Sequence, residues 1–314
     1  MEKLVLREIR DIGDSISTTF RFIGRNFKPL LEVFAFYLAA PILILSVIMG
    51  IGTMQVTSTL ASLIADPTAN PDFATDMILK QFTNPLILIG FVLSIIIMTV
   101  FTTVIYKAMS LYDANDGIIN VPDIKKELAQ DSIRVFFGTL ILFLFLLIAG
   151  ACIGLVSSLF GDFSPFVAIL LLVAPMIYAT IAASLVYPIM IEEKHNVIIA
   201  IQRSFSLVFN NWWRTFGFLF LISLILFMVL IVIRMPLSFI FGALLPLIGF
   251  ENIGISAGIT AAFMTAINYV IYLFFYVALG IWYYNLVEQK EGTQLLETLD
   301  EIGKEDKPDL DYFR

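Results

Sequence analysis

The sequence predicts an all-α integral membrane protein with six transmembrane helices, and three observations lead to this fold class. Apolar residues make up 59% of the 314 residues and charged residues only 14%, whereas soluble domains contain about 45–50% and about 25%. The mean hydropathy is +0.92. Long segments without charge recur along the chain, and each is long enough for a helix to cross about 30 Å of hydrocarbon.

These segments locate the spans, because a charged side chain at the centre of a bilayer costs about 2.5–3.5 kcal/mol on insertion scales. Two of the six carry one charge near an end, Glu32 in the first and Lys107 in the second. The first span begins behind a charged segment, so we expect no cleavable signal peptide. The predicted spans are 29–56, 85–112, 135–160, 165–191, 214–234 and 254–287.

Prolines are predicted to shape the fourth and fifth helices. Pro236 is predicted to break the fifth, because a proline ring clashes with the preceding helical turn. The apolar segment 235–250 that follows is too short to span again. We expect it to lie at the outer interface or to re-enter the membrane. Pro175 and Pro188 are predicted to bend the fourth helix.

The lysines and arginines predict the orientation. With the N-terminus inside, the cytoplasmic segments contain 17 of the 19 basic residues, which is the asymmetry of the positive-inside rule. Trp212, Trp213 and Trp282 fall at the cytoplasmic ends of the fifth and sixth spans, where an interfacial aromatic belt is expected. Residues 1–287 therefore form the predicted membrane domain, with both termini of the chain in the cytoplasm.

Residues 288–314 form a predicted acidic cytoplasmic tail. They contain nine acidic and four basic residues and so carry −5 of the net charge of −7. The membrane domain is therefore nearly neutral, with a basic inner face. The acidity of the chain argues against a general attraction to nucleic acid. We expect the tail to be one surface that a protein partner can contact.

The cytoplasmic linkers are predicted to be amphipathic helices that lie in the plane of the lipid headgroups. Apolar residues at helical spacing run through 9–27 and 197–212, and less clearly through 121–135. Either these helices seal the end of the bundle, or they bind lipid headgroups or a protein partner. Arginine suits lipid binding, because its forked donors match phosphate oxygens. The candidate contacts are Arg10, Arg21, Arg25, Arg203 and Arg214.

A weak internal repeat accompanies the linkers. A tyrosine recurs at the cytoplasmic end of each even-numbered span, three residues after a small residue. We predict three units, each an interfacial helix followed by a transmembrane hairpin, related by an axis along the membrane normal. The tyrosines are Tyr106, Tyr187 and Tyr283, and the small residues are Thr103, Ser184 and Gly280.

Each even-numbered span carries a stripe of small and polar residues. Packing explains such stripes, because small residues let membrane helices approach each other. GACIG at 150–154 and GISAG at 254–258 are predicted packing motifs of this kind. The alternative is a polar cleft centred on Asn268, since a buried amide in hydrocarbon needs partners. The candidate cleft residues are Thr103, Tyr106, Ser184, Tyr187, Asn268 and Tyr272.

The chain offers little side-chain chemistry for catalysis. A single cysteine, Cys152, excludes a disulfide within the chain. A single histidine, His195, excludes metal centres that need several imidazoles. No predicted span contains a pair of His, Asp or Glu residues for acid–base chemistry. We therefore predict no enzyme activity, no metal site and no cofactor.

The segment AIQRSFSLVFNNWWRTF at 200–216 resembles the signature of the membrane domain that accompanies some bacterial glycerophosphodiester phosphodiesterases. Related stand-alone six-helix membrane proteins of unknown function share this signature. The matching positions are Ala200, Arg203, Ser204, Leu207, Asn211 and Trp213. The segment RNFKPLL at 25–31 and the six-span layout extend the resemblance loosely. The resemblance implies a bacterial cytoplasmic (inner) membrane protein. It does not imply phosphodiesterase activity, because the barrel domain and catalytic histidines of those enzymes have no counterpart in this sequence.

Two functional hypotheses follow. We expect a non-enzymatic membrane protein whose interfacial helices bind lipid headgroups or a protein partner, with a role in envelope or lipid homeostasis. The alternative is a transporter or channel whose substrate passes through a polar cleft between the even-numbered spans.

Overall fold

The structure is a computed structural model that describes residues 4–65, 84–161, 164–249 and 252–292. Within these ranges all regular structure is helical, and six helices are long and apolar enough to cross a membrane. The prediction of an all-α, six-span membrane protein is confirmed. The spans are α3 (Ala39–Ala65), α5 (Pro85–Ala114), α7 (Leu128–Ser158), α8 (Ser164–Ala182) continued by α9 (Val186–Glu192), α11 (Trp212–Leu247) and α12 (Ile253–Glu291).

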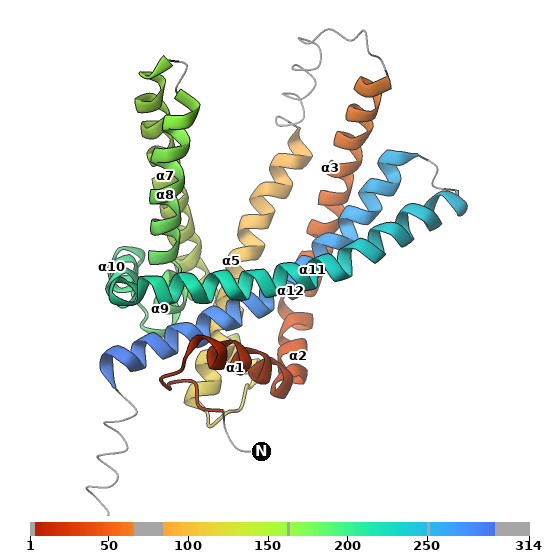
Figure 1. The fold of residues 1–314 in the computed structure, drawn as a ribbon. Helices are drawn as coiled ribbons and strands as arrows, with labels where there is room; N and C mark the ends of the chain where they lie inside the picture. Colours follow the sequence, from red (N-terminus) through yellow and green to blue (C-terminus); the bar gives the residue numbers. More distant parts are fainter. Residues whose placement is uncertain (1–3, 66–83, 162–163, 250–251, 293–314) are drawn as a thin grey trace, which may run out of the picture.

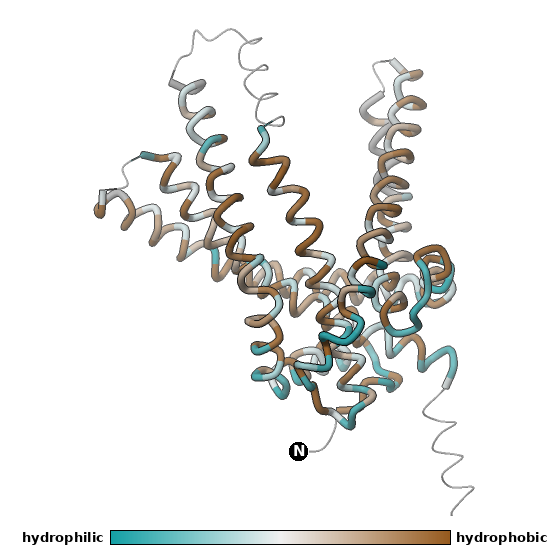
Figure 2. The backbone as a smooth tube through the Cα atoms, turned by 180° about the vertical axis from the view of Figure 1, so that it is seen from behind, coloured by the Kyte–Doolittle hydropathy of each residue, from teal (hydrophilic) through white to brown (hydrophobic). Residues whose placement is uncertain are grey.

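The spans spread from a common base (Figure 1). The α7–α8 hairpin stands on one side, α3 and α5 stand in the middle, and α11 and α12 cross them at a slant. Three shorter helices, α1 (Ile12–Arg25), α2 (Phe27–Tyr37) and α10 (Val197–Val208), gather at the base with α9. Figure 2 shows that hydrophilic residues concentrate at the base and that the spans are mainly hydrophobic.

Three breaks between helices each precede a proline. α1 and α2 end four residues before Pro29 and Pro41, and the break at 183–185 includes the residue four before Pro188. A proline ring clashes with the carbonyl group four residues earlier, so one helix ends there and the next begins with the proline in its first turn. The bend predicted at Pro188 is therefore a full break, and the first predicted span is divided between α2 and α3.

The predicted break at Pro236 is wrong. α11 continues through Pro236 to Leu247, so residues 235–247, expected at the outer interface or as a re-entrant element, extend the helix. A proline inside a long apolar helix is tolerated when neighbouring helices and small adjustments satisfy the carbonyl that it leaves free. α12 packs along α11 and provides such a neighbour.

Two of the three predicted interfacial helices form as separate helices, 9–27 as α1 and 197–212 as α10. The third, predicted over 121–135, is reduced to the single turn α6 (Val121–Ile124), and its second half is the start of α7. Glu127 separates them with a φ of 62°, a left-handed conformation that cannot continue a right-handed helix. The second predicted unit of the repeat therefore lacks a separate interfacial helix.

The second half of α12 is the centre of the base. Every residue from Val277 to Glu288 is buried, because α1, α5, α9, α10 and α11 all contact this helix. The prediction that Trp282 belongs to the interfacial belt is wrong. Its buried ring stacks on Phe218 with centroids 4.4 Å apart, and its Nε1–H donates to Thr215 at 3.1 Å.

The first half of α12 packs along α3 through glycines. A Cβ atom on Gly258 would lie 2.7 Å from the backbone oxygen of Gly50, and a Cβ atom on Gly50 would lie equally close to the oxygen of Gly258. GISAG is thus confirmed as a packing motif. GACIG differs, because a Cβ atom on Gly150 or Gly154 would meet no atom of the described residues within 4 Å.

These contacts predict opposite results for one substitution at two glycines. Gly258→Ala pushes two backbones apart and is expected to destabilise the protein by about 1–3 kcal/mol. Gly154→Ala places the same methyl group in open space, and we expect no loss of stability, because alanine favours helix over glycine. Thermal unfolding in detergent measures both. Equal unfolding temperatures for the two variants would contradict the close approach of α3 and α12.

Candidate functional site

An open groove lies between α5, α7, α9 and α12. Its volume is about 310 Å³, at the lower end of the range for small-molecule sites. Eight of its ten lining residues carry a hydroxyl group, and none carries a charge. The lining residues are Ser94, Ile95, Met98, Thr99 and Thr102 of α5, Thr139 of α7, Tyr187 of α9, and Tyr269, Tyr272 and Tyr276 of α12.

Helical spacing brings these residues to one side of each helix. The three tyrosines of α12 follow one another by three and four positions, which places them on one face. Two of these rings pack against a further aromatic residue. Phe101 of α5 contacts Tyr269 and Tyr276 with centroids 5.6 and 5.9 Å apart. Tyr269 and Tyr272 contact each other at 5.7 Å.

The hydroxyl groups differ in what they can still bind. Thr99 and Thr102 donate to carbonyl oxygens four residues back, at 2.8 and 2.7 Å, so each can only accept a further hydrogen bond. Thr102 also bonds the side chain of Tyr276. Thr139 and Tyr187 share a hydrogen bond of 3.2 Å across α7 and α9. Within the described residues, no hydrogen bond occupies the hydroxyl groups of Tyr269 and Tyr272, which remain available to a bound molecule.

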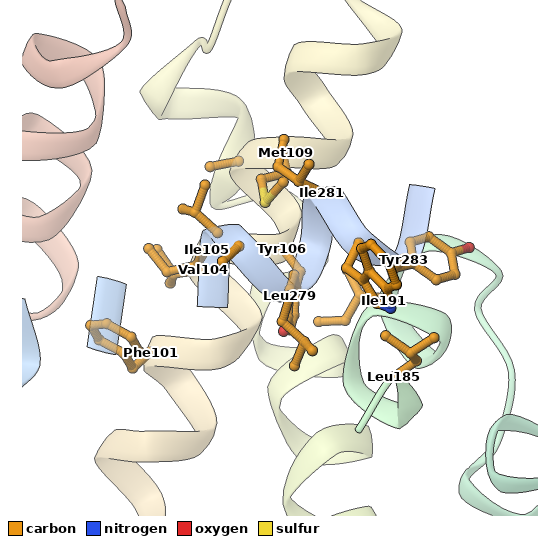
Figure 3. Close-up of a cluster of buried hydrophobic side chains, with 14 of the residues drawn as sticks. Phe101, Val104, Ile105, Tyr106, Met109, Leu185, Ile191, Leu279, Ile281 and Tyr283 are labelled. Atoms are coloured by element: carbon orange, nitrogen blue, oxygen red, sulfur yellow. The ribbon is translucent and has the colours of Figure 1, made fainter. Parts of the chain in front are cut away.

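Tyr106 lies behind the groove with a buried hydroxyl group that has no partner in the part of the chain that is described. The side chain is 1% exposed, and its ring packs edge-on against Tyr276 with centroids 6.0 Å apart. Figure 3 shows it in one cluster with Met109 and Leu279. An unpaired buried donor costs about 1–3 kcal/mol, so this group calls for a water molecule or a ligand.

The structure places the six predicted cleft residues in different surroundings. Tyr187 and Tyr272 line the groove, and Tyr106 lies behind it. Thr103 is buried on α5 and donates to its own helix. Ser184 lies in the break between α8 and α9, and no described residue pairs with its hydroxyl.

Asn268, the predicted centre of the cleft, is outside the groove. Its Oδ1 accepts a hydrogen bond from Arg234 of α11 at 3.3 Å. Sequence reasoning also missed Ser94, Thr102, Thr139 and Tyr269. Tyr269 could have been predicted, because its spacing of three and seven residues from Tyr272 and Tyr276 puts it on the same helical face. Nothing in the sequence distinguishes Thr139, which belongs to an odd-numbered span.

The arginines predicted to contact lipid are mostly engaged within the protein. Arg10 is 8% exposed, pairs with Glu8 at 2.5 Å and donates to the Leu6 carbonyl oxygen at 2.9 Å. Burial lowers the pKa of Arg10, and the charge of Glu8 opposes this effect. Arg203 pairs with Glu193 and with Glu291. These two guanidinium groups have carboxylate partners already.

The other three arginines are more exposed. Arg21 and Arg25 lie on the exposed side of α1, and Arg21 donates to Thr18 at 3.2 Å. Arg214, at the start of α11, donates to neutral acceptors only among the described residues, and the nearest is Gln289 at 3.1 Å. The lipid contacts of all five arginines stay a prediction.

The acidic neighbours of His195 are held by tyrosines of α12. Tyr284 donates to Glu192, and Tyr283 donates to Glu193 at 3.0 Å. Glu193 also lies 3.4 Å from His195. Over the residues that the structure describes, no group of three or more His, Cys, Asp or Glu side chains is arranged to hold a metal ion.

Comparisons of the chain with protein-family models, with curated proteins and with solved structures found no match. The resemblance noted at 200–216 therefore stays a prediction.

Two tyrosines test the unpaired hydroxyl. Tyr106→Phe removes a buried donor without a partner, and we expect the empty protein to become more stable by about 1 kcal/mol. Tyr284→Phe removes a donor bonded to a carboxylate and is expected to destabilise by about 1.5–3 kcal/mol. Thermal unfolding of the delipidated protein distinguishes them. Equal destabilisation by both variants would show that Tyr106 has a partner.

Proposed function

We propose that this multi-pass membrane protein binds a membrane lipid in the groove, and that the lipid has an uncharged head with hydrogen-bonding groups. The observation that carries the proposal is the lining itself, which has eight hydroxyl groups and no charge. A charged head would lose its hydration there without gaining an ionic partner, which is costly in a medium of low polarity. A neutral head would exchange hydrogen bonds with water for hydrogen bonds with tyrosine and threonine.

The apolar residues around the groove suit the hydrocarbon chains of such a lipid. Its volume fits a headgroup rather than a whole lipid. Phe91 of α5 and Phe143 of α7 contact each other with centroids 6.4 Å apart and are both exposed. Apolar surface of this kind can pack along an acyl or isoprenoid chain, while the tyrosine rings pack against the head.

We further infer that the role is binding and not catalysis. A serine, threonine or tyrosine hydroxyl needs a neighbouring base or a lowered pKa to act as a nucleophile. The lining contains no histidine, lysine or carboxylate that could supply this activation. A lipid-binding role agrees with the predicted part in envelope or lipid homeostasis.

We place the base and both termini in the cytoplasm, and the protein in a bacterial inner membrane. The distribution of basic residues supports the orientation, and the resemblance at 200–216 supports the compartment. A protein partner is proposed to contact the interfacial helices or the acidic tail. Residues 288–291 are the last turn of α12, and residues 293–314 lie outside the described residues.

Lipid titration by native mass spectrometry tests the groove. We expect the purified chain to bind dioleoylglycerol more tightly than dioleoyl phosphatidic acid, which adds a charged phosphate to the same molecule. Tyr269→Phe with Tyr272→Phe removes the two unoccupied hydroxyl groups and should weaken dioleoylglycerol binding about tenfold, because each neutral hydrogen bond contributes about 0.5–1.5 kcal/mol.

Tyr37→Phe is the matched control, because Tyr37 bonds the Val121 carbonyl oxygen at the base, away from the groove. It should leave dioleoylglycerol binding unchanged. Undiminished binding by the double variant, or equal loss in the control, rules out the groove as the site.

A transporter or channel is the second candidate function. The observation in its favour is that the groove is open and lies between three elements of the even-numbered spans, α5, α9 and α12. A polar solute could then follow the hydroxyl groups between the spans.

Cysteine labelling tests this candidate in a Cys152→Ser background, since Cys152 is exposed. A water-filled path predicts that Thr139→Cys reacts with a charged methanethiosulfonate added in water. Thr103→Cys is the control, because Thr103 is fully buried and does not line the groove. Reaction of Thr139→Cys no faster than that of Thr103→Cys would exclude an aqueous path.

A further inference from the structure

A second cavity lies at the base, where α8 meets the start of α11. Its volume is about 540 Å³, and it is lined by Tyr178 of α8 and by residues 209–214. This segment, FNNWWR, supplies one arginine, two asparagine amides and three aromatic rings. Unlike the groove, this cavity contains a positive charge, so it suits a different ligand.

The aromatic rings form a fixed wall of the cavity. Trp212 is stacked between Tyr178 and Phe216, with ring centroids 5.6 and 5.7 Å apart. Its Nε1–H is buried and has no hydrogen-bond partner among the described residues. Buried tryptophan N–H groups usually find an acceptor, so this donor beside the cavity lacks one within the described residues.

Arg214 is held in place by neutral hydrogen-bond acceptors. Its guanidinium donates to Gln289 at 3.1 Å, to Asn211 at 3.5 Å and to the Arg10 carbonyl oxygen at 3.4 Å. No carboxylate of the described residues pairs with it, whereas Arg203 nearby in sequence pairs with two. Among the described residues, the cavity therefore presents an oriented cation without a carboxylate partner.

We propose that this cavity binds the phosphate of an anionic phospholipid headgroup. Arg214 and the amide of Asn210 or Asn211 donate to phosphate oxygens, for which the guanidinium fork is well matched. A small shift of the side chains that cover the Nε1–H of Trp212 lets it donate to a phosphate or ester oxygen of the same lipid. This provides acceptors for the donors that the protein leaves unused.

The exposed rings favour a lipid over a soluble phosphate. Phe209 is 71% exposed and Trp213 is 77% exposed, which is unfavourable in water but suits the boundary between headgroups and hydrocarbon. The inference does not rest on the groove, because it concerns other residues and a lipid headgroup that is charged and not neutral.

Two variants of the cavity test the site, with phosphatidylglycerol and phosphatidylcholine as probes. The full chain in detergent is titrated with each lipid, and binding is followed by native mass spectrometry and tryptophan fluorescence. We expect preference for phosphatidylglycerol, a loss of about tenfold in Arg214→Gln, and a smaller loss in Trp212→Phe, which keeps the stacked ring and removes only the N–H. Trp212→Phe also keeps the test valid if Arg214→Gln unfolds.

Arg21→Gln is the matched control, because it removes one exposed positive charge at the base without touching the cavity. It should bind phosphatidylglycerol like the unmodified chain. Equal loss in Arg21→Gln would mean general attraction to the basic surface and would overturn the site, as would full binding by both Arg214→Gln and Trp212→Phe.

If inorganic phosphate bound at Arg214 as tightly as phosphatidylglycerol, the lipid assignment would be wrong. The groove variant Tyr269→Phe with Tyr272→Phe should leave phosphatidylglycerol binding intact, so failure at one site is separable from failure at the other.

Discussion

The burial of α12 over Val277–Glu288 is the constraint on which the rest of the structure depends. A helix enclosed on all sides must find a partner for every polar side chain, because an unpaired buried group is costly. Asn285 accepts from the Arg10 N–H at 3.1 Å and donates to the Arg10 carbonyl oxygen at 3.0 Å. Trp282 and Tyr284 bond residues of α11 and α9. The polar residues of one helix thus fix the N-terminal segment and two other elements around it.

Charge pairing at the base shows why the positions of basic residues in the sequence do not tell which of them are free to meet a ligand. Lys107 of α5 bonds Asp131 of α7 at 2.7 Å, and Asp131 is almost fully buried. Arg7 pairs with Asp113 at 2.9 Å; burial opposes its charge, but Asp113 raises the pKa of Arg7 above its usual value. Losing one member of such a pair leaves a charge without compensation. Counting lysines and arginines cannot distinguish these paired groups from Arg214, because pairing depends on tertiary contacts.

The sequence predicts the six spans well and the individual sites poorly, for identifiable reasons. Spans depend on the cost of charge in hydrocarbon, which is a local property of each segment. The course of α11 through Pro236 depends on a neighbouring helix that compensates the lost hydrogen bond. Trp282 is chemically a belt residue, and only the enclosure of α12 makes it a core residue. Asn268 looked central because it needs a partner, but that partner is Arg234, which the sequence places in another span.

The groove is uncharged and the cavity contains an arginine because the two are built from different parts of the fold. The groove is built mainly from charge-free turns of the spans, such as the turn around Thr102, so hydroxyl groups are the polar groups that it can offer at low cost. The cavity is built from the junction of α10 and α11 at the base. Hydrophilic residues concentrate at the base, and an arginine such as Arg214 is tolerated there. A phosphate in the groove would lack a cation, and a neutral head in the cavity would leave Arg214 without an anion. The two proposed sites therefore call for headgroups of different charge, and a single headgroup would not satisfy both.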